Sequence, residues 1–235
     1  MTHPLVARLR DPDPEARRDA CVAAATDPSA VLLVDALCEA LADPEKRVAR
    51  SSSDALTAIG RHDAEVSGRL NAQLRRGAHD GRWWAAFTIA RLGPPPIKLL
   101  PIFIDALEHP EGDIRWSAAK LLVELGRLEP EVLPVVLHFV ESEERPLARR
   151  MAIFCLRELA PDLEETARAL LVASRAPDRK LQQAALGALA ALLAPAPSVW
   201  QRLREAAEHD PDPANRHIAA TAIASLERRS DARST

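Results

Sequence analysis

The sequence predicts an all-α protein, an α-solenoid of about seven helical hairpins that follow one another along the chain. Composition points to helices, because hydrophobic residues make up 47% of the chain while aromatic residues make up only 3%. Ala and Leu supply most of the hydrophobic residues, and both favour helices, whereas strands favour β-branched and aromatic side chains. A repeat of 33 or 34 residues then divides the chain into similar units.

The repeat is clearest in two neighbouring segments. Asp80–Gly93 reads DGRWWAAFTIARLG, and Asp113–Gly126, 33 residues later, reads DIRWSAAKLLVELG. The apolar residues that close successive units are Ile59, Leu92, Leu125, Leu159, Leu192 and Leu226. Their separations of 33, 33, 34, 33 and 34 residues indicate six regular units after a degenerate first one.

Each unit contains two predicted helices, which we name A and B in chain order. In the fourth unit, an A helix over about Ile97–Leu107 and a B helix over about Asp113–Leu125 flank a polar EHPEG turn. The sequence predicts one array with approximate units 1–27, 28–60, 61–93, 94–126, 127–160, 161–194 and 195–228, followed by a polar C-terminal tail over 229–235. The first unit matches least, as expected for a terminal unit with solvent on one side.

Turn residues mark the helix ends. DPDPEARR, ADPEKR and DPDPANR each place Asp and Pro just before a B helix. Asp can cap the free backbone amides there, and Pro suits the first helical turn. Gly60, Gly93 and Gly126 follow the predicted ends of B helices, which predicts left-handed C-terminal caps.

These segments resemble HEAT repeats, in particular the bacterial HEAT-like repeats first grouped with phycobilisome lyases. The resemblance rests on the Asp-x-Arg-x-x-Ala and Leu-Gly positions of Asp80–Gly93 and Asp113–Gly126. It also rests on Pro101 and Pro134, which lie 33 residues apart near the start of their A helices. The resemblance implies a right-handed superhelix of HEAT-like hairpins whose B helices line the concave side.

The sequence predicts no catalytic residue, cofactor site or metal site. It contains no GxGxxG, P-loop, GxSxG or HExxH pattern. HEAT-like deoxyhypusine hydroxylases hold two irons with repeated His-Glu pairs, and this chain has no His-Glu dipeptide. The three cysteines, Cys21, Cys38 and Cys155, lie far apart, which favours reduced, buried thiols in a cytoplasmic protein.

Two rival classes stay open. Alkylpurine DNA glycosylases built from HEAT-like repeats use Trp, Asp and Arg on a basic concave face, and Trp116, Asp113 and Arg149 are similar in type. A DNA clamp needs a basic excess, whereas this chain has a formal net charge of −3, so we do not expect a nucleic-acid partner. The resemblance to phycobilisome-lyase repeats implies the other alternative, a chromophore attachment factor, although no residue identifies a tetrapyrrole site.

The sequence predicts no membrane contact. The N-terminal stretch MTHPLVARLRDPDPE lacks the apolar region of a signal peptide. The longest apolar run, Ala184–Ala194, is too short to span a bilayer. We therefore expect a cytoplasmic protein.

Equivalent positions in successive B helices form columns along a repeat array. The first column is mostly arginine: Ala49, Arg82, Arg115, Arg149, Gln182 and Arg216. The second is polar apart from two tryptophans: Arg50, Trp83, Trp116, Arg150, Gln183 and His217. The third leans toward the interior: Ser51, Trp84, Ser117, Met151, Ala184 and Ile218. The fourth is small and predicts tight helix packing: Ser52, Ala85, Ala118, Ala152, Ala185 and Ala219.

The second column predicts that Trp83 and Trp116 are at least partly exposed, because the equivalent positions in other units are polar. The predicted protein-binding patch consists of Trp83, Trp116, Arg50, Arg82, Arg115, Arg149 and Arg150. Trp and Arg are the residue types most enriched at binding hot spots. The alternative is structural: the two rings cover the core, and the first-column arginines pair with loop Asp groups, as the resemblance implies.

The remaining aromatic residues are expected to be structural. Phe103, Phe139 and Phe154 lie on apolar stretches and are interpreted as core, and Trp200 as core or cap packing. Taken with the patch, the sequence predicts a non-catalytic protein-binding scaffold or adaptor. It would act as a monomer or in a hetero-complex, and its partner would carry acidic or apolar groups.

Overall fold

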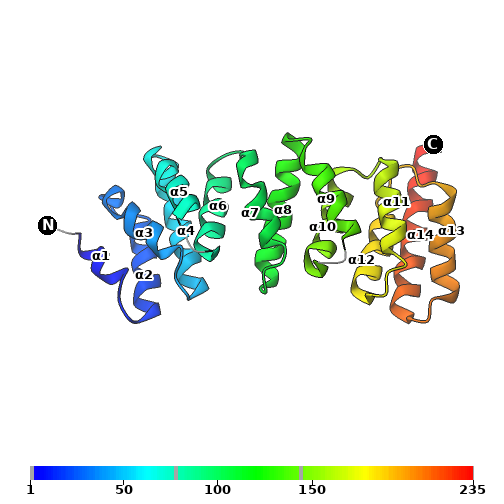
Figure 1. Ribbon diagram of the computed structural model, residues 1–235, viewed down its shortest axis with the longest axis horizontal. Helices are drawn as coiled ribbons and strands as arrows, with labels where there is room; N and C mark the ends of the chain where they lie inside the picture. Colours follow the sequence, from blue (N-terminus) through cyan, green and yellow to red (C-terminus); the bar gives the residue numbers. More distant parts are fainter. Residues whose placement is uncertain (1–2, 77–78, 143–144, 235) are drawn as a thin grey trace. The chain divides into compact units, whose positions relative to one another are not determined.

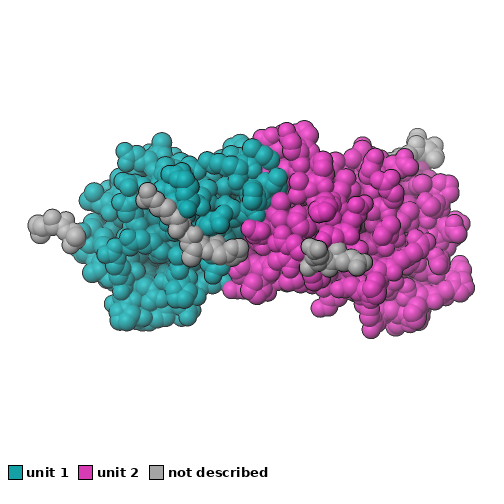
Figure 2. Space-filling model, viewed as in Figure 1, with its two compact units in different colours: residues 1–103 teal, residues 104–235 magenta. Residues whose placement is uncertain are grey.

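The computed structural model describes residues 3–76, 79–142 and 145–234, and all regular secondary structure in these ranges is helical. The predicted all-α class is therefore confirmed. Seven A/B helix pairs follow one another along the described chain (Figure 1). They divide between two compact units, residues 1–103 (unit 1) and residues 104–235 (unit 2), which are described separately (Figure 2).

Unit 1 contains three complete helix pairs. Its A helices are α1 (Pro4–Arg8), α3 (Val34–Ala40, preceded by the 3-10 helix η1, Ala30–Leu33) and α5 (Glu65–Arg76). Its B helices are α2 (Pro14–Ala24), α4 (Lys46–Gly60) and α6 (His79–Leu92). Helix α3 contacts α5, and α4 contacts both α2 and α6, so the A helices and the B helices form separate layers.

In unit 1, the 3-10 helix η2 (Ile97–Leu99) leads into α7 (Leu100–Ala106), an A helix whose residues are divided between the two units at residue 103. Unit 2 continues with the B helices α8 (Gly112–Leu128), α10 (Pro146–Leu159), α12 (Arg179–Leu189) and α14 (Pro213–Ser234). Its remaining A helices are α9 (Val132–Glu141), α11 (Glu164–Ala173) and α13 (Pro197–His209).

The helices of unit 2 also form two layers. Helix α10 contacts α8 and α12, and α12 contacts α14, which makes the B layer. Helix α11 contacts α9 and α13, which makes the A layer. None of the helices in the described ranges is both long enough and apolar enough to cross a membrane.

Two of the three Asp-Pro turns begin B helices as predicted, whereas at ADPEKR helix α4 begins at Lys46 and its N-cap residue, Glu45, makes no capping hydrogen bond through its side chain. Asp13 Oδ1 accepts a hydrogen bond from the Glu15 amide at 3.1 Å, with Pro14 in the first turn of α2. Asp212 Oδ1 accepts a hydrogen bond from the Ala214 amide at 3.0 Å at the start of α14. Each carboxylate satisfies an amide that the helix leaves free, so these motifs set where the B helices start.

The small-residue column is buried throughout, as predicted. Its members are Ser52, Ala85, Ala118, Ala152, Ala185 and Ala219, and each is fully shielded from solvent. Small side chains let neighbouring helices approach closely, so a larger residue here would meet closely packed atoms. The column therefore locates the interior of the B layer in each unit.

The predicted left-handed caps at Gly60, Gly93 and Gly126 are wrong, because no glycine in the described ranges has a positive φ. Gly60 is instead the last residue of α4, where an added Cβ would lie 3.0 Å from the Leu92 side chain. A Cβ at Gly126, inside α8, would lie 2.8 Å from Leu159 Cδ1. The close approach of the next B helix is the reason for glycine at these two positions.

The last B helix extends beyond the predicted end of the array at residue 228. Helix α14 continues through Ser234, so most of the segment 229–235 is helical. Arg229 donates hydrogen bonds to the carbonyl oxygens of Ala190 and Ala191, just beyond the end of α12. A cation is favourable at a helix C-terminus, where carbonyl groups lack partners, and this contact fixes the last turns of α14.

Candidate binding surface

The prediction that Trp83 is partly exposed is wrong. Its side chain on α6 is only 3% exposed. The ring centroid lies 5.6 Å from that of Phe87, one turn later, and 6.4 Å from that of Phe103 on α7. Trp83 therefore belongs to an aromatic cluster in the core of unit 1.

Trp84 is also buried, which confirms the prediction that it points inward. Neighbouring residues on a helix point about 100° apart, so two adjacent buried rings require a helix that is covered on more than one side. Helix α6 meets this requirement, since Ala85, Ala86 and Thr88 are buried as well.

Trp116 is exposed, as predicted. Its side chain on α8 is 46% exposed. The ring meets the ring of Phe154 on α10 edge to face, with a centroid distance of 4.9 Å and an interplanar angle of 78°. The Arg157 guanidinium lies 5.1 Å from the centroid of the Phe154 ring. We call Trp116, Phe154 and Arg157 the aromatic cluster of unit 2.

The sequence interpretation missed two members of this cluster. Phe154 was expected in the core, but it is only half-buried. Phe154 follows the second-column residue Arg150 by four positions, and residues four apart share one face of a helix. That spacing could have placed Phe154 beside the exposed column. Of the other two expected core residues, Phe103 is fully buried, whereas Phe139 is only half-buried like Phe154.

The first-column arginines of unit 2 bind backbone carbonyls. Arg115 Nη1 donates to the carbonyl oxygens of His109 and Pro110 at 2.6 and 2.8 Å. Arg149 Nε donates to the Val140 carbonyl at 2.7 Å. These side chains hold the turn between the A helix and the B helix of their own unit.

The same contact recurs elsewhere in the chain. Arg216 Nη1 donates to the carbonyls of Asp210 and Pro211, and Arg17 Nη1 in unit 1 donates to those of Asp11 and Pro12. Arg17 also donates through Nε and Nη2 to the loop residue Asp43, at 2.6 and 3.0 Å, which is the Asp pairing that the structural alternative expects. The repetition shows that this arginine position has a structural role in both units. It leaves Arg115 and Arg149 less available for a partner than the sequence suggested.

The remaining patch residues differ in exposure. Arg50 on α4 is exposed, and Arg82 on α6 is half-buried. Arg150 on α10 is half-buried. Of the seven predicted residues, Trp116, Arg50, Arg82 and Arg150 therefore combine at least partly accessible side chains with no side-chain hydrogen bond to any residue in the described ranges.

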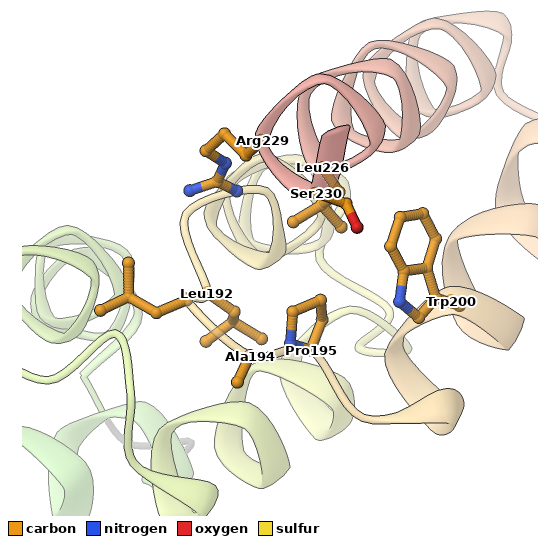
Figure 3. Close-up of a pocket in the computed structure, with 8 residues that line it drawn as sticks. Leu192, Ala194, Pro195, Trp200, Leu226, Arg229 and Ser230 are labelled. Carbon is orange, nitrogen blue, oxygen red and sulfur yellow. The ribbon is translucent and has the colours of Figure 1, made fainter. Parts of the chain in front are cut away.

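A hollow of about 390 Å³ lies at the C-terminal end of unit 2 (Figure 3). Trp200 of α13 lies on one side and Arg229 of α14 on the other, with Pro195 between them. The side chain of Trp200 is half-buried, so it lines this hollow instead of lying fully in the core. Nη1 and Nη2 of Arg229 already donate hydrogen bonds to the carbonyls beyond α12, so they are less available to bind a ligand in the hollow.

The cysteines are poor nucleophiles. Cys21, Cys38 and Cys155 are all buried. Burial disfavours the thiolate and raises the pKa of each thiol to about 12. Within residues 3–76, 79–142 and 145–234, no three His, Cys, Asp or Glu side chains gather in a way that could hold a metal ion.

The thiols should resist alkylation in the folded protein. Because a thiolate is the reactive form, we expect iodoacetamide at about pH 8 to label the native chain far more slowly than the urea-unfolded chain. Intact mass spectrometry over time measures the number of adducts. Rapid labelling of a native cysteine at the rate of the unfolded chain would contradict the buried, protonated thiols.

Comparisons with known proteins agree with the repeat pattern. A family model of HEAT repeats matches residues 68–157. No curated protein matches the chain. Among solved structures, an engineered protein is 17% identical to this chain. The alignment covers 95% of this chain and 67% of the engineered protein, with a TM-score of 0.44.

Two further solved structures are similar at the same level. Human deoxyhypusine hydroxylase in complex with glycerol is 18% identical, with 95% of this chain and 83% of that chain covered and a TM-score of 0.42. A designed armadillo repeat protein in complex with the peptide (KR)4 is 13% identical, with 94% and 98% covered and a TM-score of 0.42. The family match agrees with the resemblance to HEAT repeats seen in the sequence, and the matched residues 68–157 include Trp116 and Phe154.

Proposed function

We propose that this chain is a non-catalytic, cytoplasmic protein-binding scaffold or adaptor, and that the B layer of unit 2 is its binding surface. The observation that carries the proposal is the exposed ring of Trp116, held edge to face by Phe154. An exposed tryptophan beside arginine is the composition most typical of a protein-binding hot spot.

The aromatic cluster suits an anchor because it is already ordered. Phe154 limits the positions open to the Trp116 ring, so a partner that covers the ring loses less side-chain entropy on binding. The surrounding B layer is a set of packed helices, which keeps the anchor at a fixed position on the surface. The chain would act as a monomer or within a hetero-complex.

The buried cysteines support the non-catalytic part of the proposal. With the pKa of each thiol raised to about 12, none is poised as a nucleophile near neutral pH. Arg149, which resembled a residue of the HEAT-like glycosylases, donates to a backbone carbonyl and holds a turn. These contacts favour a structural role over one in DNA-base chemistry.

Substituting Trp116 tests the proposal. Tagged wild-type chain and Trp116→Ala are used to capture partners from the native cell, and the captured proteins are measured by quantitative mass spectrometry. Loss of a hot-spot tryptophan should reduce the specific partners by about tenfold or more. Because the ring is 46% exposed, the free energy of unfolding should fall by less than about 3–5 kcal/mol, the cost of removing a fully buried tryptophan.

The matched control is Val172→Ala, which removes an apolar side chain that is 59% exposed on α11 in the A layer of the same unit. This variant should capture the same partners as the wild type. Undiminished capture by Trp116→Ala would refute the proposed surface. Salt-dependent DNA binding would instead favour the nucleic-acid alternative, and a coloured adduct formed with a bilin would favour a chromophore attachment factor.

A further inference from the structure

We infer that the partner presents an acidic segment carrying an apolar side chain to the B layer of unit 2. This inference rests on the proposed function and adds the chemistry of the partner. It follows from how charge is distributed between the two helix layers of unit 2 and around Trp116.

The two layers of unit 2 differ in charge. Helices α8, α10 and α12 of the B layer together carry eight Lys or Arg and three Asp or Glu. Helices α9, α11 and α13 of the A layer carry three Lys or Arg and five Asp or Glu. The chain as a whole has a formal net charge of −3, and within unit 2 the basic excess belongs to the B layer. A local excess of one sign selects partners of the opposite sign.

Two cations flank the aromatic cluster. Lys120 follows Trp116 by four residues on α8 and is exposed. Arg150 precedes Phe154 by four residues on α10 and is half-buried. Residues four apart share one face of a helix, so each cation lies on the same face as an aromatic ring.

Lys120 and Arg150 also remain available. Neither forms an ion pair or a side-chain hydrogen bond with any residue in the described ranges, and Arg157 differs from them because it binds Glu158 at 2.8 Å. A carboxylate of the partner could therefore bind either cation without breaking an existing ion pair. Such a contact places charge-assisted hydrogen bonds around an apolar anchor.

The same surface disfavours a continuous polyanion. Glu124 is exposed one turn after Lys120 on α8, and Glu158 follows Arg157 on α10. A nucleic-acid backbone with a charge at every nucleotide would meet these carboxylates, whereas a peptide can place its acidic residues only opposite the cations. The pattern therefore fits an acidic peptide segment better than a nucleic acid.

Synthetic peptides test the inference by fluorescence polarisation with the full chain. The probe is a fluorescein-labelled peptide of repeated Glu-Glu-Leu-Gly units. The comparison peptides replace every Glu with Lys, or every Leu with Gly, and a labelled single-stranded oligothymidylate tests for polyanion binding. The acidic, apolar peptide should bind about tenfold or more tightly than both comparison peptides, and its affinity should fall as salt is raised.

Variants locate the site. Lys120→Gln with Arg150→Gln, and separately Trp116→Ala, should each weaken binding of the acidic peptide by about tenfold or more. The matched control is Arg168→Gln with Arg204→Gln, which removes two exposed arginines from α11 and α13 in the A layer. This control should leave binding within about twofold of the wild type. Circular dichroism verifies that every variant keeps its helical content.

Several outcomes would overturn the inference: no binding by any peptide, equal binding of the acidic and basic peptides, tighter binding of the oligothymidylate, or no effect of Lys120→Gln with Arg150→Gln. Failure of the proposed function gives a different result. If Trp116→Ala releases the cellular partners but Lys120→Glu with Arg150→Glu retains them, the scaffold function stands and the acidic partner is wrong. If Trp116→Ala retains them, the scaffold surface itself is wrong.

Discussion

Trp83→Ala should reduce the free energy of unfolding by about 3–5 kcal/mol, the usual cost of removing a large aromatic side chain from a core. Trp83 is only 3% exposed and contacts Phe87 and Phe103, so its removal leaves a cavity between α6 and α7. Phe103 is itself fully buried, which limits how far the surroundings can collapse into that space.

Trp116→Ala and Trp83→Phe are the comparison variants for this measurement. Urea unfolding followed by circular dichroism should show a much larger loss for Trp83→Ala than for Trp116→Ala, whose ring is 46% exposed. Trp83→Phe should cost less than Trp83→Ala, because it keeps most of the ring volume. It also removes the Trp83 Nε1 donor, which is buried and has no hydrogen-bond partner among the described residues. A Trp83→Ala variant as stable as wild type would show that the ring is not part of the core.

Local patterns predicted the helices well. Helix boundaries follow from capping residues and hydrophobic periodicity, and both lie within one unit. An example is the Asp13 carboxylate, which accepts a hydrogen bond from the Glu15 amide. The small-residue column was also predictable, because packing of the same two helices recurs in each unit and demands small side chains every time. The prediction of left-handed glycine caps was wrong because Gly60 and Gly126 allow a close contact with the next B helix. The sequence pattern of a single unit does not reveal that contact.

The candidate site was only partly predictable. The prediction assumed that all residues of one column have the same solvent exposure. Trp83 and Trp116 would then be as exposed as the polar residues at the equivalent positions of other units. The assumption holds for Trp116 and fails for Trp83, because an aromatic cluster with Phe87 and Phe103 surrounds this ring alone. Exposure of a large ring depends on which side chains surround it, and those neighbours come from other helices.

The arginine positions show the same limit. The repeat correctly identified a recurring arginine, and in the first unit Arg17 binds the expected kind of partner, Asp43. Other partners are carbonyl oxygens, such as those of His109 and Pro110. Every residue has a carbonyl, so the sequence offers no sign of which one an arginine binds. Only side-chain partners such as Asp leave a pattern that sequence comparison between units can detect.

Arg202→Leu should reduce the free energy of unfolding by about 1–3 kcal/mol, the cost of leaving a buried acceptor without its donor. Arg202 on α13 is 5% exposed, and Nη2 donates to the Ser174 carbonyl at 2.6 Å while Nε donates to Ser174 Oγ at 3.0 Å. Ser174 is the C-terminal cap of α11, so the guanidinium satisfies a carbonyl at the end of one A helix from the next A helix.

The sign of this effect depends on two opposed contributions. Burial lowers the pKa of Arg202, which shows that the fold holds the charged form at a cost. Leucine removes that cost and keeps much of the apolar stem, but it cannot donate to Ser174. We expect the orphaned carbonyl to outweigh the relief, because a buried acceptor without a partner loses its full hydration.

Arg204→Leu is the matched control, since Arg204 lies two residues further along α13 and is exposed. Its effect on stability should stay within about 0.5 kcal/mol. Arg202→Lys should recover part of the loss, because an ammonium can donate to the Ser174 carbonyl but cannot match the two-point contact of the guanidinium. If Arg202→Leu proves as stable as Arg204→Leu, the contact with Ser174 does not stabilise the packing of α13 against α11.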